Sequence, residues 1–582
     1  MKRALALCLI VCLGAAVPAD NAVRGVRAEG WLEQTRSPVL ARNGMVATSQ
    51  PLAAEAGLRI LMEGGNAVDA AVATAATLNV VEPMMVGMGA DVFAIIYIAK
   101  DHRYYVLNAS GEAPSGATIA RMNALGYHYD PKNWGPGSGM PSGGILDVTV
   151  PGSVWGWDEV LRRFGRMKFA QVLQPAIDYA QNGYPVSERI AHIWKLPNAL
   201  PLRGCCTRLD PNSVRTWYID GVPPKTGQIY RNPALAHSFR LLQKYGRDVF
   251  YRGEIARAIV ATSRRLGGTM TMADLANYRG EWVKPIDTVY HGYHILELPP
   301  PTQSFAANEA LNILAQCVPK VVPGQTLASL GPRSPEYWHL LVEAKKLAYA
   351  DLYRYNGDPD YVSVPLARLL STQYAASLCP KIDPNHAATI AAPGEPSGAG
   401  DTIVLSTADR WGNMVSWVNS NYDEFGSGIT VPGYGFILHD RGGLFTLNPR
   451  SPNALAPHKR PFNTLMAGFI ERGGRPLMTL GLMGGDMQAQ GHEQIAVDII
   501  DLGANVQQAG DMARFRQDEI SDTLYLESPL YDLVGDRLRA MGHNVRSSNR
   551  APMGGYQAIM LLSNGAYAGG SDFGKDGEAV GW

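Results

Sequence analysis

The feature that most constrains this chain is the junction between a small, polar segment and a strand near residue 400. Pro393–Gly400 is rich in Gly, Pro and Ser, which favours a loop. A run of β-branched and apolar residues begins at Thr402 and predicts a strand. Turn residues at Asp409–Gly412 precede a second apolar run at 414–418. The sequence therefore predicts a β-hairpin whose first residue, Thr402, directly follows a linker.

Cleavage of the chain between Asp401 and Thr402 would place a free α-amine beside the Thr402 hydroxyl. A threonine hydroxyl is a weak nucleophile and needs a base. An α-amine has a pKa of about 8, low enough to accept a proton near neutral pH. Before cleavage, attack of the hydroxyl on the Asp401 carbonyl would shift the acyl group from nitrogen to oxygen, and hydrolysis of that ester would release the amine. Because a threonine at a strand start is common, this interpretation depends on further motifs.

Further motifs occur in order along the chain. They are Met45–Ala53, Gly64–Ala71, Phe425–Gly428, Lys459–Pro461, Met483–Asp486, Gly570–Asp572 and Asp576–Gly577. With Gly400–Thr402 and its hairpin, they resemble the γ-glutamyltransferase family of N-terminal-nucleophile hydrolases, in its acylase-like branch. That family includes glutathione hydrolases and cephalosporin-type acylases. The resemblance covers nearly the whole mature chain and implies an α+β fold, a four-layer αββα sandwich self-cleaved into a large subunit, residues 20–401, and a small subunit, residues 402–582.

Alternating helical and strand patterns also predict, without the resemblance, a mixed α/β domain. Helical spacing is clearest at 304–314 and 335–355, and one strand is expected over 288–298. After Thr402 the expected strands are 403–408, 414–418, 434–438, 464–470 and 477–482, and the expected helices are 493–502, 506–513 and 529–541.

The resemblance implies catalytic roles for three residues beside Thr402. Gly484 and Gly485 match an oxyanion-hole pair, whose backbone N–H groups stabilise a tetrahedral intermediate. Ser420 falls where the family has a hydroxyl residue that orients the nucleophile. The structural alternatives are an ordinary turn after a strand for the glycines and a serine in a polar loop for Ser420.

The chain departs from the family at the residues that bind substrate. The motif Arg-Glu-x-Ala-Pro, whose arginine binds the substrate α-carboxylate, begins here with Ser110, which cannot form the bidentate charged pair of an arginine. The acidic pair that holds the substrate α-amine is replaced by Arg441 and Leu444, and an asparagine is replaced by Tyr422. The usual grip on a γ-glutamyl group is therefore not visible.

Other polar residues could line the same pocket. Asn463 and Thr464 occupy the position of a paired-serine motif and keep hydrogen-bonding groups. Asp423, Glu424 and Asp440, together with Arg441, offer charges close in sequence for a different grip on the substrate.

The amino terminus has the shape of a secretory signal. Lys2-Arg3 precedes an apolar run, Ala4–Val17, that is too short to span a bilayer, and small residues follow it. We expect a signal peptide at residues 1–19 and an exported, periplasmic or secreted protein with no membrane attachment after signal removal. The balance of 52 basic and 52 acidic residues gives no indication of a nucleic-acid partner.

No cofactor or metal is expected from the sequence. His492-Glu493 begins like a zinc-protease motif, but Ala496 stands where the second histidine should be. The mature chain keeps four cysteines, which permit disulfides in an exported protein but do not reveal their connectivity. They are Cys205, Cys206, Cys317 and Cys379.

These observations predict a self-activating amidase that forms an acyl-enzyme at Thr402. The resemblance implies hydrolysis or transfer of a γ-glutamyl group from glutathione-type substrates. The lost arginine and acidic pair favour an alternative, an acylase for another side-chain amide, such as a cephalosporin-type acyl group. A third possibility, from another class, is a non-catalytic scaffold that keeps the fold. The expected partners are a small-molecule amide and the two subunits of one precursor.

Overall fold

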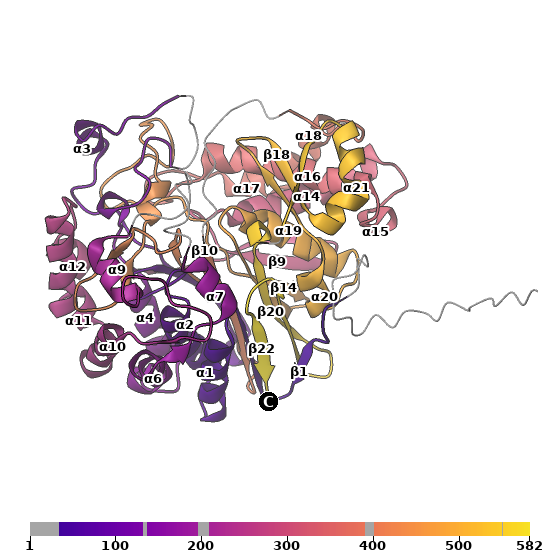
Figure 1. Cartoon of the computed structure of the whole chain (residues 1–582). Coiled ribbons are helices and arrows are strands. Elements are labelled where there is room, and N and C mark those ends of the chain that lie inside the picture. The colour runs from indigo at the N-terminus through magenta and orange to yellow at the C-terminus, as the bar shows by residue number, and fades with distance from the viewer. Residues whose placement is uncertain (1–33, 132–136, 196–208, 390–400, 550) are drawn as a thin grey trace, which may run out of the picture.

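A computed structural model of the chain describes residues 34–131, 137–195, 209–389, 401–549 and 551–582 (Figure 1). The expected signal peptide, the Cys205–Cys206 pair and the Pro393–Gly400 linker lie outside the described residues. Within the described part, no helix combines the length and the apolar character needed to cross a membrane.

The predicted hairpin is confirmed, and it forms the middle of a seven-stranded antiparallel sheet. Its strands pair in register from Ala408↔Met414 at the turn to Asp401↔Tyr422 at the open end, with an irregularity between Asp401 and Ile403. In spatial order the strands are β22 (Glu578–Gly581), β2 (Gly44–Thr48), β10 (Asp401–Asp409), β11 (Met414–Tyr422), β3 (Asp91–Ile98), β4 (Arg103–Ala109) and β7 (Glu281–Val283).

A second, eight-stranded sheet packs against the first. Its strands are β1 (Val39–Ala41), β21 (Tyr567–Ser571), β20 (Gly555–Leu561), β15 (Arg475–Leu480), β14 (Gly468–Arg472), β9 (Tyr293–Glu297) and β8 (Ile286–Tyr290), with β16 (Leu482–Met483) paired to β20. One apolar cluster contains side chains from both sheets, including Val404 of β10 and Phe469 of β14. Because side chains alternate along a strand, Ile403 and Leu405 belong instead to the core on the opposite face of the hairpin.

Helices cover the outer face of each sheet, and this gives the expected αββα sandwich (Figure 1). The helices beside the seven-stranded sheet include α1 (Pro51–Met62), α2 (Ala67–Val81), α4 (Ser153–Phe164), α6 (Gln174–Asn182), α10 (Pro233–Tyr245) and α12 (Glu254–Arg265). Those beside the eight-stranded sheet include α14 (Ser304–Val321), α16 (Pro335–Tyr355), α18 (Thr372–Leu378), α19 (Met487–Ile500), α20 (Val506–Asp511) and α21 (Ser528–Ala540).

The turn of the hairpin is fastened to α2 by one buried carboxylate. Asp409 accepts hydrogen bonds from the backbone N–H groups of Ala67 (2.9 Å), Trp411 (2.8 Å) and Asn413 (3.1 Å). A carboxylate at a helix N-terminus satisfies backbone donors that the helix leaves unpaired. The turn end of the hairpin is thereby fixed against α2, which is buried along its whole length.

Several sequence-based boundaries are corrected. The expected strand at 288–298 is a hairpin of β8 and β9, because His291 (φ 48°) and Gly292 (φ 84°) form the two-residue turn that such hairpins favour. The strand expected to begin at 464 begins at Gly468, and the helix expected from 493 begins at Met487. A three-stranded sheet was not expected; it contains β17 (Phe515–Asp518), β18 (Thr523–Glu527) and β19 (Asn544–Ser548). A disulfide joins Cys317 to Cys379.

Candidate active site

Thr402 lies at the open end of the hairpin and is almost fully buried. Its side chain is 2% exposed, and its Oγ1 donates a hydrogen bond to Ser420 Oγ over 3.2 Å. Ser420 is itself held in place, because its hydroxyl oxygen accepts the backbone N–H of Tyr422 over 2.7 Å. The pairing of β10 with β11 thus places the two hydroxyls in contact.

Gly484 and Gly485 form the turn between β16 and α19. Both have positive φ, 122° and 59°, a region that favours glycine. A Cβ at Gly484 would lie 3.0 Å from the Gly554 Cα, so the turn needs a residue without a side chain. Neither N–H has an acceptor among the described residues, and both glycines immediately precede the N-terminal end of a 14-residue helix, which favours negative charge.

Arg441 is the most unusual charged residue of the site. Its side chain is fully buried, its Cζ lies 4.7 Å from the centre of the Tyr422 ring, and its Nη1 donates to Thr464 Oγ1 over 2.8 Å. Its Nε and Nη2 have no hydrogen-bond partner in the described part of the chain. Burial lowers the pKa of Arg441, but a guanidinium keeps its proton in proteins. The site therefore contains a buried cation with unused donors.

Tyr422, which supports Arg441, has a strained backbone. Its φ of 81° is rare for a residue other than glycine, and its side chain is only 6% exposed. Such strain costs about 1–3 kcal/mol and is concentrated at functional sites. The strained residue is the last of β11, two residues after Ser420 in the same strand.

Gln303 connects Thr464 to Gly485. It was not predicted from the sequence as a site residue. It is fully buried, and its Nε2 donates to the carbonyl oxygens of Thr464 (2.6 Å) and Gly485 (2.9 Å). The only signal for it in the sequence is its position just after the run Pro299–Pro301. Direct contacts therefore lead, in order, through Thr402, Ser420, Tyr422, Arg441, Thr464, Gln303 and Gly485.

The remaining candidate residues differ in their contacts. Asn463 is buried beside Thr464; its Oδ1 accepts from Leu465 N–H, and its Nδ2 has no partner among the described residues. Ser110 uses its hydroxyl to donate to Asn108 Oδ1 over 2.7 Å and is not part of the contact series. Asp440 is buried next to Arg441, and burial raises its pKa to about 6.

The space beside Thr402 is small. Thr402 borders a cavity of about 10 Å³ that is also lined by Arg189 of α7 (Glu188–Ile193), by Met483 and by Lys575. A cavity of this size holds roughly one water molecule.

A family model, related sequences and solved structures all match nearly the whole chain. The family described as gamma-glutamyltranspeptidase matches residues 53–582. A glutathione hydrolase-like proenzyme of Bacillus subtilis (strain 168) is 35% identical over 552 residues, which are 93% of this chain and 99% of that protein. An acylase proenzyme of Pseudomonas sp. (strain SE83) is 33% identical over 546 residues, 94% of each. The solved structure of a cephalosporin acylase from Bacillus halodurans has a TM-score of 0.83 at 36% identity, over 94% of this chain and 97% of its own.

One prediction concerns Asp486, which follows the two glycines. Its side chain is buried, its Oδ1 has no hydrogen-bond partner among the described residues, and burial raises its pKa from 3.8 to about 7. A carboxyl whose pKa is raised in the folded state favours its neutral form there. Its contribution to stability is therefore complete at low pH and is lost as the pH rises from 3.8 through about 7.

We expect Asp486→Asn to match the wild type in stability at pH 4 and to exceed it at pH 8.5. The raised pKa corresponds to about 4 kcal/mol at most. Urea unfolding at the two pH values measures the difference. The exposed Asp532→Asn is the matched control and should show no pH-dependent gain. Equal stability of Asp486→Asn and wild type at pH 8.5 would show that the buried carboxylate carries no such cost.

Proposed function

The chain belongs to the γ-glutamyltranspeptidase family, and on that premise we propose that it is an exported amidase that cleaves itself before Thr402 and then uses Thr402 as its nucleophile. The observation that carries the proposal is the buried hydrogen bond from Thr402 Oγ1 to Ser420 Oγ at the end of the central hairpin. The names of the relatives, which describe proenzymes, support a processed precursor.

In the proposed maturation, the Thr402 hydroxyl oxygen attacks the carbonyl carbon of Asp401. The C–N bond of the tetrahedral intermediate breaks, the Thr402 nitrogen takes the proton from the hydroxyl, and an ester remains. Water then hydrolyses the ester, which leaves a carboxylate on Asp401 and a free α-amine on Thr402. Ser420 orients the attacking hydroxyl through the 3.2 Å contact.

In the proposed catalytic cycle, the α-amine of Thr402 accepts the proton of its own hydroxyl as the oxygen attacks the substrate amide. The N–H groups of Gly484 and Gly485 stabilise the oxyanion, by about 3 kcal/mol each. The proton passes to the leaving amine, the amide C–N bond breaks, and an acyl ester forms at Thr402. Water or an acceptor amine then removes the acyl group.

The polar groups around Arg441 favour one class of acyl group in the substrate. Nε and Nη2 of Arg441 and Nδ2 of Asn463 are buried donors without partners in the described chain, and a substrate carboxylate would satisfy them. Arg441 stands where the family has an anion for the substrate ammonium. A cation there repels an α-ammonium group, so this observation favours an acyl group with a carboxylate but no amine over a γ-glutamyl group.

The first prediction concerns the nucleophile. Thr402→Ala removes the hydroxyl and should abolish both self-cleavage and amide hydrolysis, by at least about 10³-fold. Thr402→Ser keeps a hydroxyl and should retain measurable amounts of both. Release of a chromogenic amine from an anilide substrate measures hydrolysis. Hydrolysis by Thr402→Ala at the wild-type rate would refute the proposed role of Thr402. If neither the wild type nor any variant hydrolyses the substrate, a non-catalytic scaffold is favoured.

The second prediction concerns the acyl group. We expect turnover of a glutaryl anilide to exceed that of a γ-glutamyl anilide. Arg441→Met preserves the bulk over Tyr422 but removes the donors. This substitution should raise KM for the glutaryl substrate about 10- to 100-fold, because it removes a hydrogen bond to a charged group. KM for a butyryl anilide, which has no carboxylate, should stay unchanged.

Arg189→Met is the matched comparison, because Arg189 lines the cavity at Thr402. If Arg189→Met selectively loses turnover of the glutaryl anilide and Arg441→Met does not, then Arg189 rather than Arg441 binds the substrate carboxylate. Preference of the wild type for the γ-glutamyl anilide would instead support a glutathione hydrolase.

A further inference from the structure

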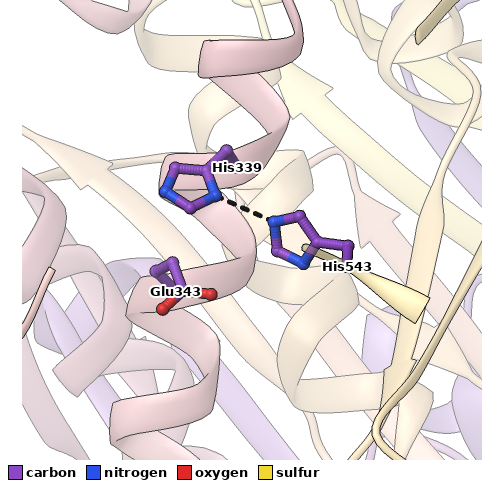
Figure 2. A group of neighbouring side chains, drawn as sticks. All are labelled: His339, Glu343 and His543. Atoms are coloured by element: carbon purple, nitrogen blue, oxygen red, sulfur yellow. Dashed lines mark hydrogen bonds between the residues drawn. The ribbon is translucent and has the colours of Figure 1, made fainter. Parts of the chain in front are cut away.

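A second cluster of polar side chains lies in the helical layer beside the eight-stranded sheet. His339 and Glu343 are four residues apart on α16 and so project from the same face of the helix, and His543 approaches them from the segment between α21 and β19 (Figure 2). All three side chains are buried. One ligand atom from each lies within 4.8 Å of the other two.

The hydrogen bonds around His339 fix its tautomer. His339 Nε2 lies 2.7 Å from the carbonyl oxygen of Asp383. A carbonyl oxygen only accepts, so Nε2 carries the hydrogen, and the Nδ1 lone pair of the neutral ring faces His543 Nε2, 2.8 Å away (Figure 2). A ligating histidine is oriented in this manner in metal sites, where the other ring nitrogen donates to a carbonyl or carboxylate.

The charges around the cluster are compatible with a divalent cation. Glu343 Oε2 accepts from Ala388 N–H over 3.1 Å, and Glu343 Oε1 lies 3.1 Å from Lys346 Nζ. Lys346 also donates to the Ala388 carbonyl over 2.9 Å and lies 3.6 Å from Asp522 Oδ1, so it keeps partners if a cation takes Oε1.

We propose that His339 Nδ1, His543 Nε2 and a Glu343 carboxylate oxygen bind one divalent cation of the zinc class, with the hydrogen of the neutral His543 ring moving from Nε2 to Nδ1 as the cation binds. Two imidazoles and a carboxylate are ligands that zinc accepts, with water as the fourth. Tetrahedral bonds of about 2.1 Å place two nitrogens roughly 3.4 Å apart, so the rings separate by about 0.6 Å from their 2.8 Å hydrogen bond.

The site would fasten three separate parts of the chain. α16 supplies two ligands, the segment before β19 supplies the third, and the cluster also holds residues 383–388 through the Asp383 carbonyl and the Ala388 N–H. These residues precede the segment that leads to Asp401. If the chain is cut before Thr402, His543 belongs to the small subunit and the other two ligands to the large one. This bridging role rests on the proposed function, whereas the binding of the cation does not.

The test measures zinc in the purified full-length protein after removal of metal with a chelator, addition of excess Zn²⁺ and gel filtration. We expect about one zinc per chain in the wild type, and at most about a tenth of that in His543→Gln and in Glu343→Gln. His386→Gln is the matched control, because His386 is 75% exposed and lies just after Asp383. It should bind zinc as the wild type does.

Two further measurements separate a metal site from a packing defect. Saturating Zn²⁺ should raise Tm in wild type and in His386→Gln but not in His543→Gln, each compared with its own metal-free form. Co²⁺ should give the visible absorption of a tetrahedral site only in the proteins that bind zinc. A wild type without bound zinc, or a His543→Gln protein with as much zinc as the wild type, would overturn the proposal and leave a hydrogen-bonded histidine pair.

Thr402→Ala separates this proposal from the proposed function. Zinc should bind to it as to the wild type, whether or not either protein is cleaved. If the wild type is cleaved, the chelator should lower the urea concentration at which its fragments separate on gel filtration. Separation at the same concentration with and without zinc would overturn the bridging role alone.

Discussion

The pairing of β10 with β11 is the constraint on which the rest of the structure depends. Both strands lie in the middle of a sheet that is covered on one face by helices and on the other by the second sheet. A shift of one residue in this pairing would turn Val404 toward the helices and Ile403 and Leu405 toward the second sheet. The register is therefore strongly fixed. Asp409 anchors the turn to α2. Thr402 and Ser420 therefore meet at the open end of the hairpin.

Around the open end of the hairpin lie buried polar groups that are not all paired within the described part of the chain. A buried donor without a partner costs about 1–3 kcal/mol, and native proteins contain few of them. Arg441 and Asn463 both have donors without a partner among the described residues, and Tyr422, whose ring contacts Arg441, adds backbone strain. A substrate carboxylate would accept hydrogen bonds from these donors, and this is the physical reason to propose substrate recognition there.

Secondary structure that depends on neighbouring residues could be predicted from the sequence. Contacts between residues far apart in the chain could not. The hairpin at Thr402 and the helix α16 follow from residue periodicity, and the layers followed from the family resemblance. Nothing local indicates that Gln303 reaches Gly485, because the two are 182 residues apart and meet only after the sheets pack. The same is true of His339 and His543, 204 residues apart. No local pattern in the sequence brings these two histidines together.

The central claim is that Thr402 becomes the amino terminus of a separate chain. Intact mass measurement and amino-terminal sequencing of the purified, exported protein test it most directly. We expect two fragments, the smaller with the mass of residues 402–582 and threonine as its first residue. A single uncut chain that still hydrolyses an amide, or a smaller fragment that begins at another residue, would contradict it.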